Sequence, residues 1–487
     1  MSLNVLLVTL DQFRGDSWSG AGHPLVRTPH LDALAAAGSR LARHYSQAAP
    51  CAPGRASLYT GMYQMNHRVV ANGTPLDAWF DTIALAGRRA GYAPAVFGYT
   101  DQALDPRLAE GPEDLRLSTY NGVLPGFDAV LDLPDDQAPW VAWLERLGYD
   151  TSPGVGRLLA SESDRPAEHS LAAFLTDHAL DWLARQDGPW FAHLSYFRPH
   201  PPYSAAGHWS NAYDPADVAL PVAPAGGPHH PFHAHLLGEP RVTAPADEHR
   251  VRRMRAQYYG MISEVDDQLG RLWAALRDMG AWNETLVIVT SDHADMLGDH
   301  GLRGKVGYWE QSYHILGIVR HPHLATTHGA VVDAFTENVD VMPTVCEALG
   351  VAVPAQCDGL PLTPFLRGEQ PPHWRDAAHW EFDWRGELID TIGHAWPWDR
   401  ALEECHLAVR RDDETAYVQF GDGSWLCFDL ATDPSWRTTI EDPAIVLPRA
   451  QAMLTWRARH TDRLLADMLN ERGGIGRWPP MPATWGA

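Results

Sequence analysis

The sequence predicts an α/β protein with a large, mostly parallel β-sheet sandwiched between helices and a smaller C-terminal α+β domain that carries an antiparallel sheet. Short apolar runs at 4–10, 190–196 and 285–290 each end abruptly in polar residues, as strands buried on both faces do. Helical periodicity separates these runs, and such alternation favours a parallel sheet. Beyond about residue 371, short strand-like runs at 414–420 and 424–430 follow one another across Asp-Gly and Asp-Pro turns, which predicts an antiparallel sheet.

The apolar runs deliver polar residues where ligands bind in such sheets. The first run, 4–10, leads into Asp11 and Gln12, and the last leads into Asp292. Apolar residues recur every three or four positions over 254–279, which predicts a helix, and a second helix is expected over 171–183. Because ligands bind outside the carboxyl ends of parallel strands, Asp11, His200 and Asp292 are expected at one site.

Two segments lack a regular pattern. Residues 201–248 are rich in Pro, Gly, Ala and His without periodicity, which predicts a long surface excursion that could roof the site. Its run at 229–235, HHPFHAH, has no carboxylate partners, so we expect a flexible loop rather than a metal site. We expect a catalytic domain over 1–370 and an antiparallel-sheet subdomain over 371–487. The tail from Arg459 would be an arm that packs on a partner subunit. This predicts a homo-oligomer, either a dimer or a tetramer.

Composition excludes several classes of partner. Acidic residues outnumber basic ones by 61 to 38, giving a net charge of −23, which argues against nucleic acid or an anionic membrane surface as the partner. An anionic substrate must then be attracted locally, by a metal or a few cations. We expect a cytoplasmic protein, since we see neither a leader sequence nor an apolar run of bilayer length. The five cysteines are scattered, and except for Cys51 we expect small buried hydrophobes.

A signature begins at Cys51. Residues 51–61, CAPGRASLYTG, contain the pattern C-x-P-x-R-x-x-x-x-T-G, and TPHLDALAAAG (28–38), SDH and GDH (291–300) and FDLATDP (428–434) lie around it. In this order they resemble the sulfatase family of the alkaline phosphatase superfamily over nearly the whole chain. The stretches at 65–76, 97–100, 196–203, 304–308 and 456–463 further resemble bacterial phosphonate monoester hydrolases and related arylsulfatases.

The resemblance implies that Cys51 is oxidised to formylglycine by a formylglycine-generating enzyme. It also implies that residue 51 binds one metal together with Asp11, Gln12, Asp292 and His293. Oxygen ligands with one imidazole nitrogen suit a divalent cation, calcium or manganese first. One hydroxyl of the aldehyde hydrate would attack sulfur or phosphorus. Deprotonation of the other hydroxyl would re-form the carbonyl and release the bound anion by C–O cleavage, which predicts promiscuity.

Other roles are carried over on the same resemblance. Arg55 would support the nucleophile, while His200 and Lys305 would hold the anionic oxygens and help the leaving alkoxide depart. The resemblance places Asn72, Tyr99 and Thr100 as contacts to the substrate or the hydrate. Asp101 stands where the resemblance to phosphonate hydrolases implies a hydroxyl residue. A carboxylate at this position disfavours additional negative charge on the substrate. Asp299 and His300 are expected as a capping or supporting pair.

These observations favour a formylglycine- and metal-dependent hydrolase of sulfate monoesters, acting on small anionic esters in the manner of an arylsulfatase. Promiscuity toward phosphonate monoesters and phosphodiesters is expected. The first alternative is primarily a phosphonate monoester hydrolase or phosphodiesterase. The second is a catalytically silent binding protein in which Cys51 stays a thiol, and the chemical state of residue 51 separates it from the other two.

Overall fold

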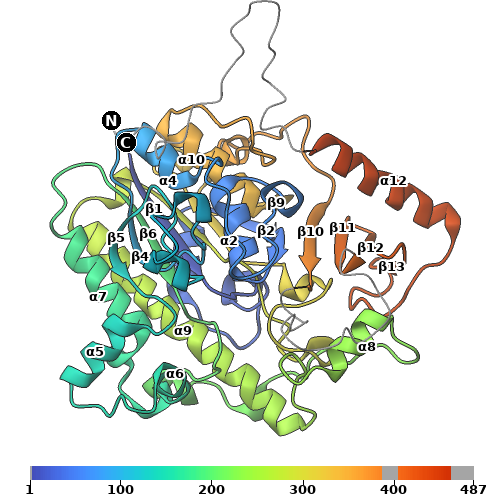
Figure 1. Ribbon diagram of the computed structural model, residues 1–487, viewed down its shortest axis with the longest axis horizontal. Helices are drawn as coiled ribbons and strands as arrows, with labels where there is room; N and C mark the ends of the chain where they lie inside the picture. Colours follow the sequence, from blue (N-terminus) through green and yellow to red (C-terminus); the bar gives the residue numbers. More distant parts are fainter. Residues whose placement is uncertain (1–2, 386–403, 462–487) are drawn as a thin grey trace, which may run out of the picture.

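The computed structural model describes residues 3–385 and 404–461 and contains a large and a small β-sheet (Figure 1). The large sheet has the strand order β5-β4-β6-β1-β7-β8-β2-β9. Its neighbouring strands are parallel except around β8, which runs antiparallel to β7 and to β2. This confirms the predicted fold class. The strands are β1 (Asn4–Leu10), β2 (Ser39–Tyr45), β4 (Ala95–Gly98), β5 (Asp128–Asp132), β6 (Phe191–Tyr196), β7 (Thr285–Thr290), β8 (Gly317–Arg320) and β9 (Ala330–Glu337).

Strand β1 lies between two hydrophobic cores. Its residues are all buried, and because side chains alternate along a strand, Leu6 and Val8 pack with α7 and α9 while Val5 and Leu7 pack with α2, α4 and α10 (Figure 1). The helices are α1 (Pro29–Ala36), α2 (Cys51–Thr60), α3 (Gln64–His67), α4 (Ile83–Arg89), α5 (Ala138–Arg146), α6 (Val155–Ala160), α7 (Leu171–Leu183), α8 (Pro231–Gly238), α9 (Glu248–Asp278), α10 (Val341–Leu349), α11 (Thr363–Leu366) and α12 (Pro443–Arg459).

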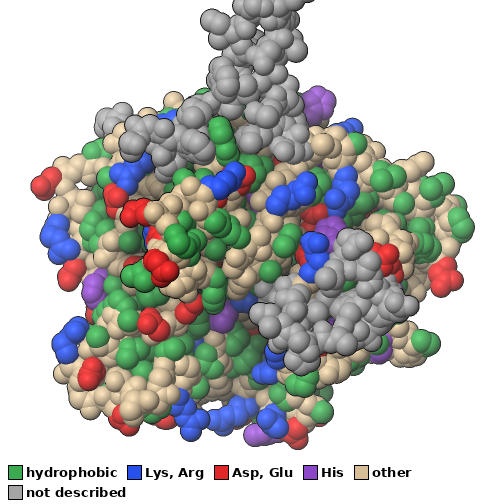
Figure 2. All heavy atoms as spheres, viewed as in Figure 1, with side chains coloured by type: hydrophobic (Ala, Val, Ile, Leu, Met, Phe, Trp, Pro, Cys, Tyr) green, Lys and Arg blue, Asp and Glu red, His purple; other side chains and the backbone are tan. Residues whose placement is uncertain are grey.

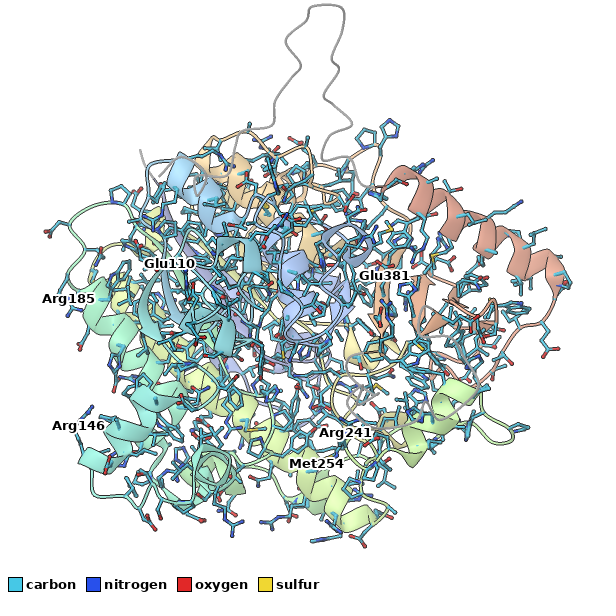
Figure 3. All side chains as sticks on the ribbon, in the orientation of Figure 1. Glu110, Arg146, Arg185, Arg241, Met254 and Glu381 are labelled. Carbon is cyan, nitrogen blue, oxygen red and sulfur yellow. The ribbon has the colours of Figure 1, made fainter. Side chains whose placement is uncertain are left out.

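The small sheet is built mainly from the C-terminal part of the chain. It has the order β13-β12-β11-β10-β3, with β10 to β13 antiparallel. Its edge strand β3 comes from the residues directly before α2 and pairs in parallel with β10. Glu381 of β10 (Figure 3) accepts from the backbone of Met65 at 2.8 Å and pairs with Arg457 of α12. The strands are β3 (Ala48–Ala49), β10 (Ala378–Asp383), β11 (His406–Arg411), β12 (Thr415–Phe420) and β13 (Trp425–Asp429).

Most predicted elements are confirmed with small shifts in their ends. The strand at 285–290 and the helix at 171–183 have the predicted limits. Helix α9, on which Met254 lies (Figure 3), begins six residues before the predicted start because Asp247 caps it by accepting from the backbone of Arg250. The division of the chain at residues 370 and 371 stays a prediction, and the proposed arm beyond residue 461 lies outside the described residues.

The histidine-rich run at 229–235 is a correction. We expected a flexible surface loop, but the run forms most of helix α8. Pro231 occupies the first turn, where proline is favoured, and the His230 side chain accepts from the backbone of Phe232. Phe232 and Leu236 are buried in the core shared with the small sheet, so tertiary burial creates a helix that periodicity did not reveal.

In 3–385 and 404–461, no helix combines the length and the apolar character that a membrane span requires. On the face shown in Figure 2, acidic and basic side chains are interspersed with apolar ones.

Asp266 of α9 fixes the start of helix α1. Its carboxylate accepts from the backbone N–H groups of His30 at 3.0 Å and Leu31 at 2.7 Å. Burial raises the pKa of Asp266 from its ordinary 3.8 to about 7. Between these values the folded protein holds a proton that the unfolded chain releases, so Asp266 makes the free energy of unfolding fall as pH rises.

We predict that Asp266→Asn removes this dependence. The unfolding free energy of the wild type minus that of the variant should decrease between about pH 4 and pH 7, by at most about 1.4 kcal/mol per pH unit, and level off above pH 7. Urea denaturation at a series of pH values measures it. Asp333→Asn, at a side chain 81% exposed, is the control. A wild-type minus Asp266→Asn difference independent of pH would contradict the prediction.

Candidate active site

Four neighbouring parallel strands deliver their following residues to one edge of the large sheet. The strands are β4, β6, β1 and β7. Asp11 follows β1, Asp292 and His293 follow β7, His200 lies just beyond β6, and the segment 99–101 follows β4. The structure therefore brings the polar residues predicted at strand ends together.

Helix α2 brings Cys51 to the same edge. Cys51 is the first residue of the helix and 4% exposed. Its Sγ lies 3.3 Å from His293 Nε2 and 2.8 Å from Lys305 Nζ. The helix packs closely against the residues after β7, because a Cβ built at Gly54 would lie 2.4 Å from the carbonyl oxygen of Asp292. Only glycine allows this approach without a shift of the backbone.

The predicted ligands form a cluster that fits a divalent cation. Ligand atoms of Asp11, Cys51, Asp292 and His293 all lie within 4.8 Å of one another. The buried Oδ1 of Asp11 has no hydrogen-bond partner among residues 3–385 and 404–461. Burial, followed by repulsion from Asp292, raises the pKa of Asp11. A cation between the carboxylates would satisfy the unpaired oxygen and remove the repulsion.

Gln12 is oriented to join this cluster. Its side-chain Nε2 donates to Asp295, while its Oε1 is buried without a hydrogen-bond partner in the described part of the chain. The amide thus offers an oxygen in the manner that hard cations prefer. Asp295 also accepts from the hydroxyl of Tyr203 at 2.8 Å and from the backbone of Gly304 at 2.9 Å. It therefore links Gln12 to the loop that carries Lys305.

Arg55 holds two of the carboxylates in place. Its side chain is fully buried and donates to Asp292 Oδ2 at 2.9 Å and to Asp11 Oδ2 at 3.1 Å. It also donates to Ser195 Oγ at 2.7 Å, and its guanidinium lies 4.3 Å from the ring centre of Tyr99. Burial alone would raise the pKa of Asp292, but the positive charges of His293, Arg55 and Lys305 lower it.

Lys305 and His200 carry different charges. Burial lowers the pKa of Lys305, but Cys51 and Asp11 outweigh this effect and raise it, so Lys305 is a cation. Burial and then Lys305 lower the pKa of His200 well below its ordinary value, so its imidazole is neutral. The Nδ1 atom of His200 lies 2.6 Å from the carbonyl oxygen of Pro201, and on that geometry Nδ1 is assigned the proton. The other ring nitrogen, Nε2, is therefore an acceptor. Lys305 is therefore the donor of the two.

Cys51, His200 and Lys305 line a pocket of about 200 Å³. Asn72 lines it while accepting from the backbone of Ala52 at 2.9 Å, and the Tyr99 hydroxyl donates to Asp11 at 2.5 Å. The structure does not bring Thr100 to the pocket, because its hydroxyl donates to Gly122 and accepts from Leu124. The lining residues are Asp11, Cys51, Asn72, Tyr99, Asp101, Tyr120, Asn121, Asp135, Gln137, Leu159, Phe197, His200 and Lys305.

Asp101 occupies the pocket wall beside Arg55. Its Oδ2 lies 3.6 Å from Arg55 Nε. Burial raises the pKa of Asp101 to about 7, with Asp11 and Asp292 adding to the rise and Arg55 opposing it.

Several pocket and supporting residues escaped the sequence prediction. Asp295 stands three residues after Asp292 in SDHAD, a spacing that could have suggested a supporting carboxylate. Tyr120, Asp135 and Gln137 come from irregular segments without a recognisable signal.

Asp299 and His300 lie outside the ligand cluster. Asp299 pairs with Arg14 at 2.7 Å, and the His300 ring stacks on Trp309 with ring centres 5.0 Å apart.

Comparison with known proteins agrees with this geometry. A family model described as Sulfatase matches residues 3–351, and one described as N-sulphoglucosamine sulphohydrolase, C-terminal, matches 298–445. The chain is 35% identical, over 97% of its length and 98% of the relative, to the multifunctional alkaline phosphatase superfamily protein PehA of Trinickia caryophylli. It is 26% identical to an arylsulfatase of Clostridium perfringens over 90% of each chain. The crystal structure of the phosphonate monoester hydrolase of Agrobacterium radiobacter matches with a TM-score of 0.90 and 41% identity, over 98% of this chain and 100% of that chain.

We predict that Gly54→Ala displaces Cys51 from the cluster. The added methyl group meets the backbone of Asp292, which cannot give way cheaply, so we expect a loss of about 1–3 kcal/mol in unfolding free energy and at least about a hundredfold in kcat/KM. Gly156→Ala in α6, where a Cβ meets nothing within 4 Å, is the matched control and should change neither quantity by much. Full activity in Gly54→Ala would show that the close approach is dispensable.

Proposed function

Because this chain belongs to the sulfatase family, we propose that it hydrolyses esters with one negative charge on a tetrahedral sulfur or phosphorus centre, using formylglycine made from Cys51 and one divalent cation. Its relatives identify it as a hydrolase acting on sulfate or phosphonate esters. The observation that carries the proposal is the position of the Cys51 thiol within the cluster of Asp11, Asp292 and His293, beside the Lys305 ammonium.

The side chains divide the work of the reaction. Asp11, Gln12, Asp292 and His293 would hold the cation, for which calcium and manganese are suitable. Formylglycine supplies a hydrated aldehyde as nucleophile and the cation supplies Lewis acidity when both are present. Lys305 donates to the anionic oxygens of the ester and stabilises the negative charge that grows as the alcohol departs.

Other residues position the reacting groups. Arg55 keeps the two carboxylates at a fixed separation. Conversion of Cys51 requires a formylglycine-generating enzyme, which we propose as the partner that matures this protein.

The charges around residue 51 support a substrate with a single negative charge. Lys305 is the only Lys or Arg among the residues lining the pocket in the described chain, whereas Asp11 and Asp101 both line it. A second negative charge on the substrate would be repelled by Asp101. It would also be repelled by any negative charge of the ligand carboxylates that the cation does not neutralise. Sulfate monoesters, phosphonate monoesters and phosphodiesters all meet this requirement, and phosphate monoester dianions do not.

Within this class we rank phosphonate monoesters and phosphodiesters first and aryl sulfate esters second. This order reverses the one expected from sequence. It is supported by 41% identity over 98% of the chain to a phosphonate monoester hydrolase, against 26% over 90% to an arylsulfatase. The charge on the tetrahedral centre is the same in both orders, so the proposed chemistry does not change.

A substrate panel tests this proposal. Mass spectrometry of the peptide containing residue 51 first establishes conversion, since an unmodified cysteine in protein from the natural host would favour the silent binding protein. The converted enzyme should hydrolyse 4-nitrophenyl phenylphosphonate, bis(4-nitrophenyl) phosphate and 4-nitrophenyl sulfate with kcat/KM at least about tenfold above that for 4-nitrophenyl phosphate, because a second charge costs at least about 1.4 kcal/mol. Cys51→Ala is the inactive control. Preference for the phosphate dianion would contradict the proposal.

Asp101→Asn tests the charge argument directly. Burial raises the pKa of Asp101 to about 7, so the assay is run above about pH 8, where the carboxylate is ionised. Removing it there should raise kcat/KM for the phosphate dianion relative to the sulfate monoanion by about tenfold, since one less repulsion is worth roughly 1–2 kcal/mol. Asparagine tolerates the left-handed backbone of this residue, with φ of 53°, so the variant should fold. The ratio between sulfate and phosphodiester, both monoanions, is the internal control and should stay within about twofold. An unchanged dianion ratio would show that Asp101 does not set charge selectivity.

A further inference from the structure

The active-site pocket has a buried end and an exposed end of different chemistry. Asp11 and Cys51, at 1% and 4% exposure, form the buried end. Tyr120, at 41% exposure, and the exposed Asp135 line the same pocket and form its mouth. When the anionic centre of an ester lies at residue 51, its organic group extends toward this mouth.

The mouth carries negative charge beside aromatic and apolar surface. Asp135 lies beside Tyr120, because after burial its negative charge is the main cause that raises the pKa of the Tyr120 hydroxyl. Phe197 and Leu159 complete the wall. Of the residues that line the pocket in the described chain, Lys305 alone is Lys or Arg, and it contacts Cys51 at the buried end. Nothing positive therefore faces Asp135 from the pocket lining in 3–385 and 404–461.

Gln137 adds an unused hydrogen-bond acceptor to this wall. Its side chain is 3% exposed, and its Oε1 has no hydrogen-bond partner within the described ranges. Although Gln137 is the residue before helix α5, its side chain does not cap that helix. A buried acceptor left unpaired is unfavourable, and a donor on a bound ligand would remove that cost.

We propose that the mouth binds a primary ammonium group, so that the substrate is an ester whose alcohol carries an alkylammonium. This rests on the proposed function only for the placement of the ester anion. An ammonium has three N–H donors, which suit the Asp135 carboxylate and the Gln137 amide oxygen, and it is attracted by the face of an aromatic ring such as Tyr120.

Other kinds of organic group fit this mouth less well. A second anion would be repelled by Asp135 and by Asp101. A purely apolar group would leave Gln137 Oε1 unpaired and would remove water from Asp135 without replacing it. The ammonium alone satisfies the acceptor and balances the charge.

Titration calorimetry on Cys51→Ala protein loaded with a divalent cation tests the proposal without hydrolysis. The ligands are 2-aminoethyl sulfate and propyl sulfate, which have the same number of heavy atoms and differ in the ammonium. We expect 2-aminoethyl sulfate to bind about tenfold more tightly at low salt, since a partly exposed ion pair combined with a cation–π contact is worth roughly 1–2 kcal/mol. Raising the ionic strength should reduce this ratio.

Two aspartate variants locate the effect. Asp135→Asn should lower the ratio of the two affinities by about threefold to tenfold. Asp136→Asn removes the same charge one residue away, at an exposed side chain that does not line the pocket and whose capping of Ala138 asparagine can keep, and should leave the ratio within about twofold.

Equal affinities, tighter binding of propyl sulfate, binding of neither ester, or equal effects of the two variants would each overturn the proposal. Failure of the proposed function is a separate result. Converted enzyme that hydrolyses the aryl panel while calorimetry shows no ammonium preference refutes only this inference. An ammonium preference in calorimetry without hydrolysis of any panel substrate refutes only the proposed function.

Discussion

Two buried carboxylates held close together are the constraint on which the rest of this structure depends. Asp11 and Asp292 follow the neighbouring parallel strands β1 and β7, and each is at most 1% exposed. Like charges in such a place are unfavourable unless positive charge lies between or beside them. Arg55 supplies part of that charge through hydrogen bonds to both groups. The Oδ1 of Asp11, which has no hydrogen-bond partner in the part of the chain that the structure describes, marks where a divalent cation would supply the remainder.

The elements around this pair serve to place residue 51 and Lys305 against it. Helix α2 approaches the end of β7 at Gly54, and the strand before it, β3, is an edge of the small sheet. The small sheet therefore supports the start of α2 as well as forming the C-terminal part of the fold. On the other side, Asp295 joins Gln12 to the backbone of Gly304. The clustered side chains, Cys51 and Lys305 are thus connected through a few buried contacts.

Sequence predicted the parts of this arrangement that are encoded locally. The apolar runs of β1 and β7 are contiguous, so the polar residues at the strand ends followed from them, whereas the ligand set was implied by the family resemblance that the contiguous Cys51 signature carries. Helix α8 did not, because the burial of Phe232 against the small sheet decides its structure. The position of Thr100 could not be predicted either, since its hydroxyl forms hydrogen bonds with the backbone of a loop more than twenty residues further along the chain. The pocket mouth depends wholly on such loops.

In the two proposals, the pocket combines one strong requirement with one weaker preference. In the proposed function a single negative charge binds at the buried end, where Lys305 and the predicted cation site lie, and in the further inference the acidic mouth selects the organic group. The most direct measurement of the central claim is anomalous X-ray diffraction from crystals grown with Mn²⁺. The account predicts one manganese peak coordinated by Asp11, Gln12, Asp292, His293 and residue 51. Absence of a peak there, in crystals that show manganese elsewhere, would contradict it.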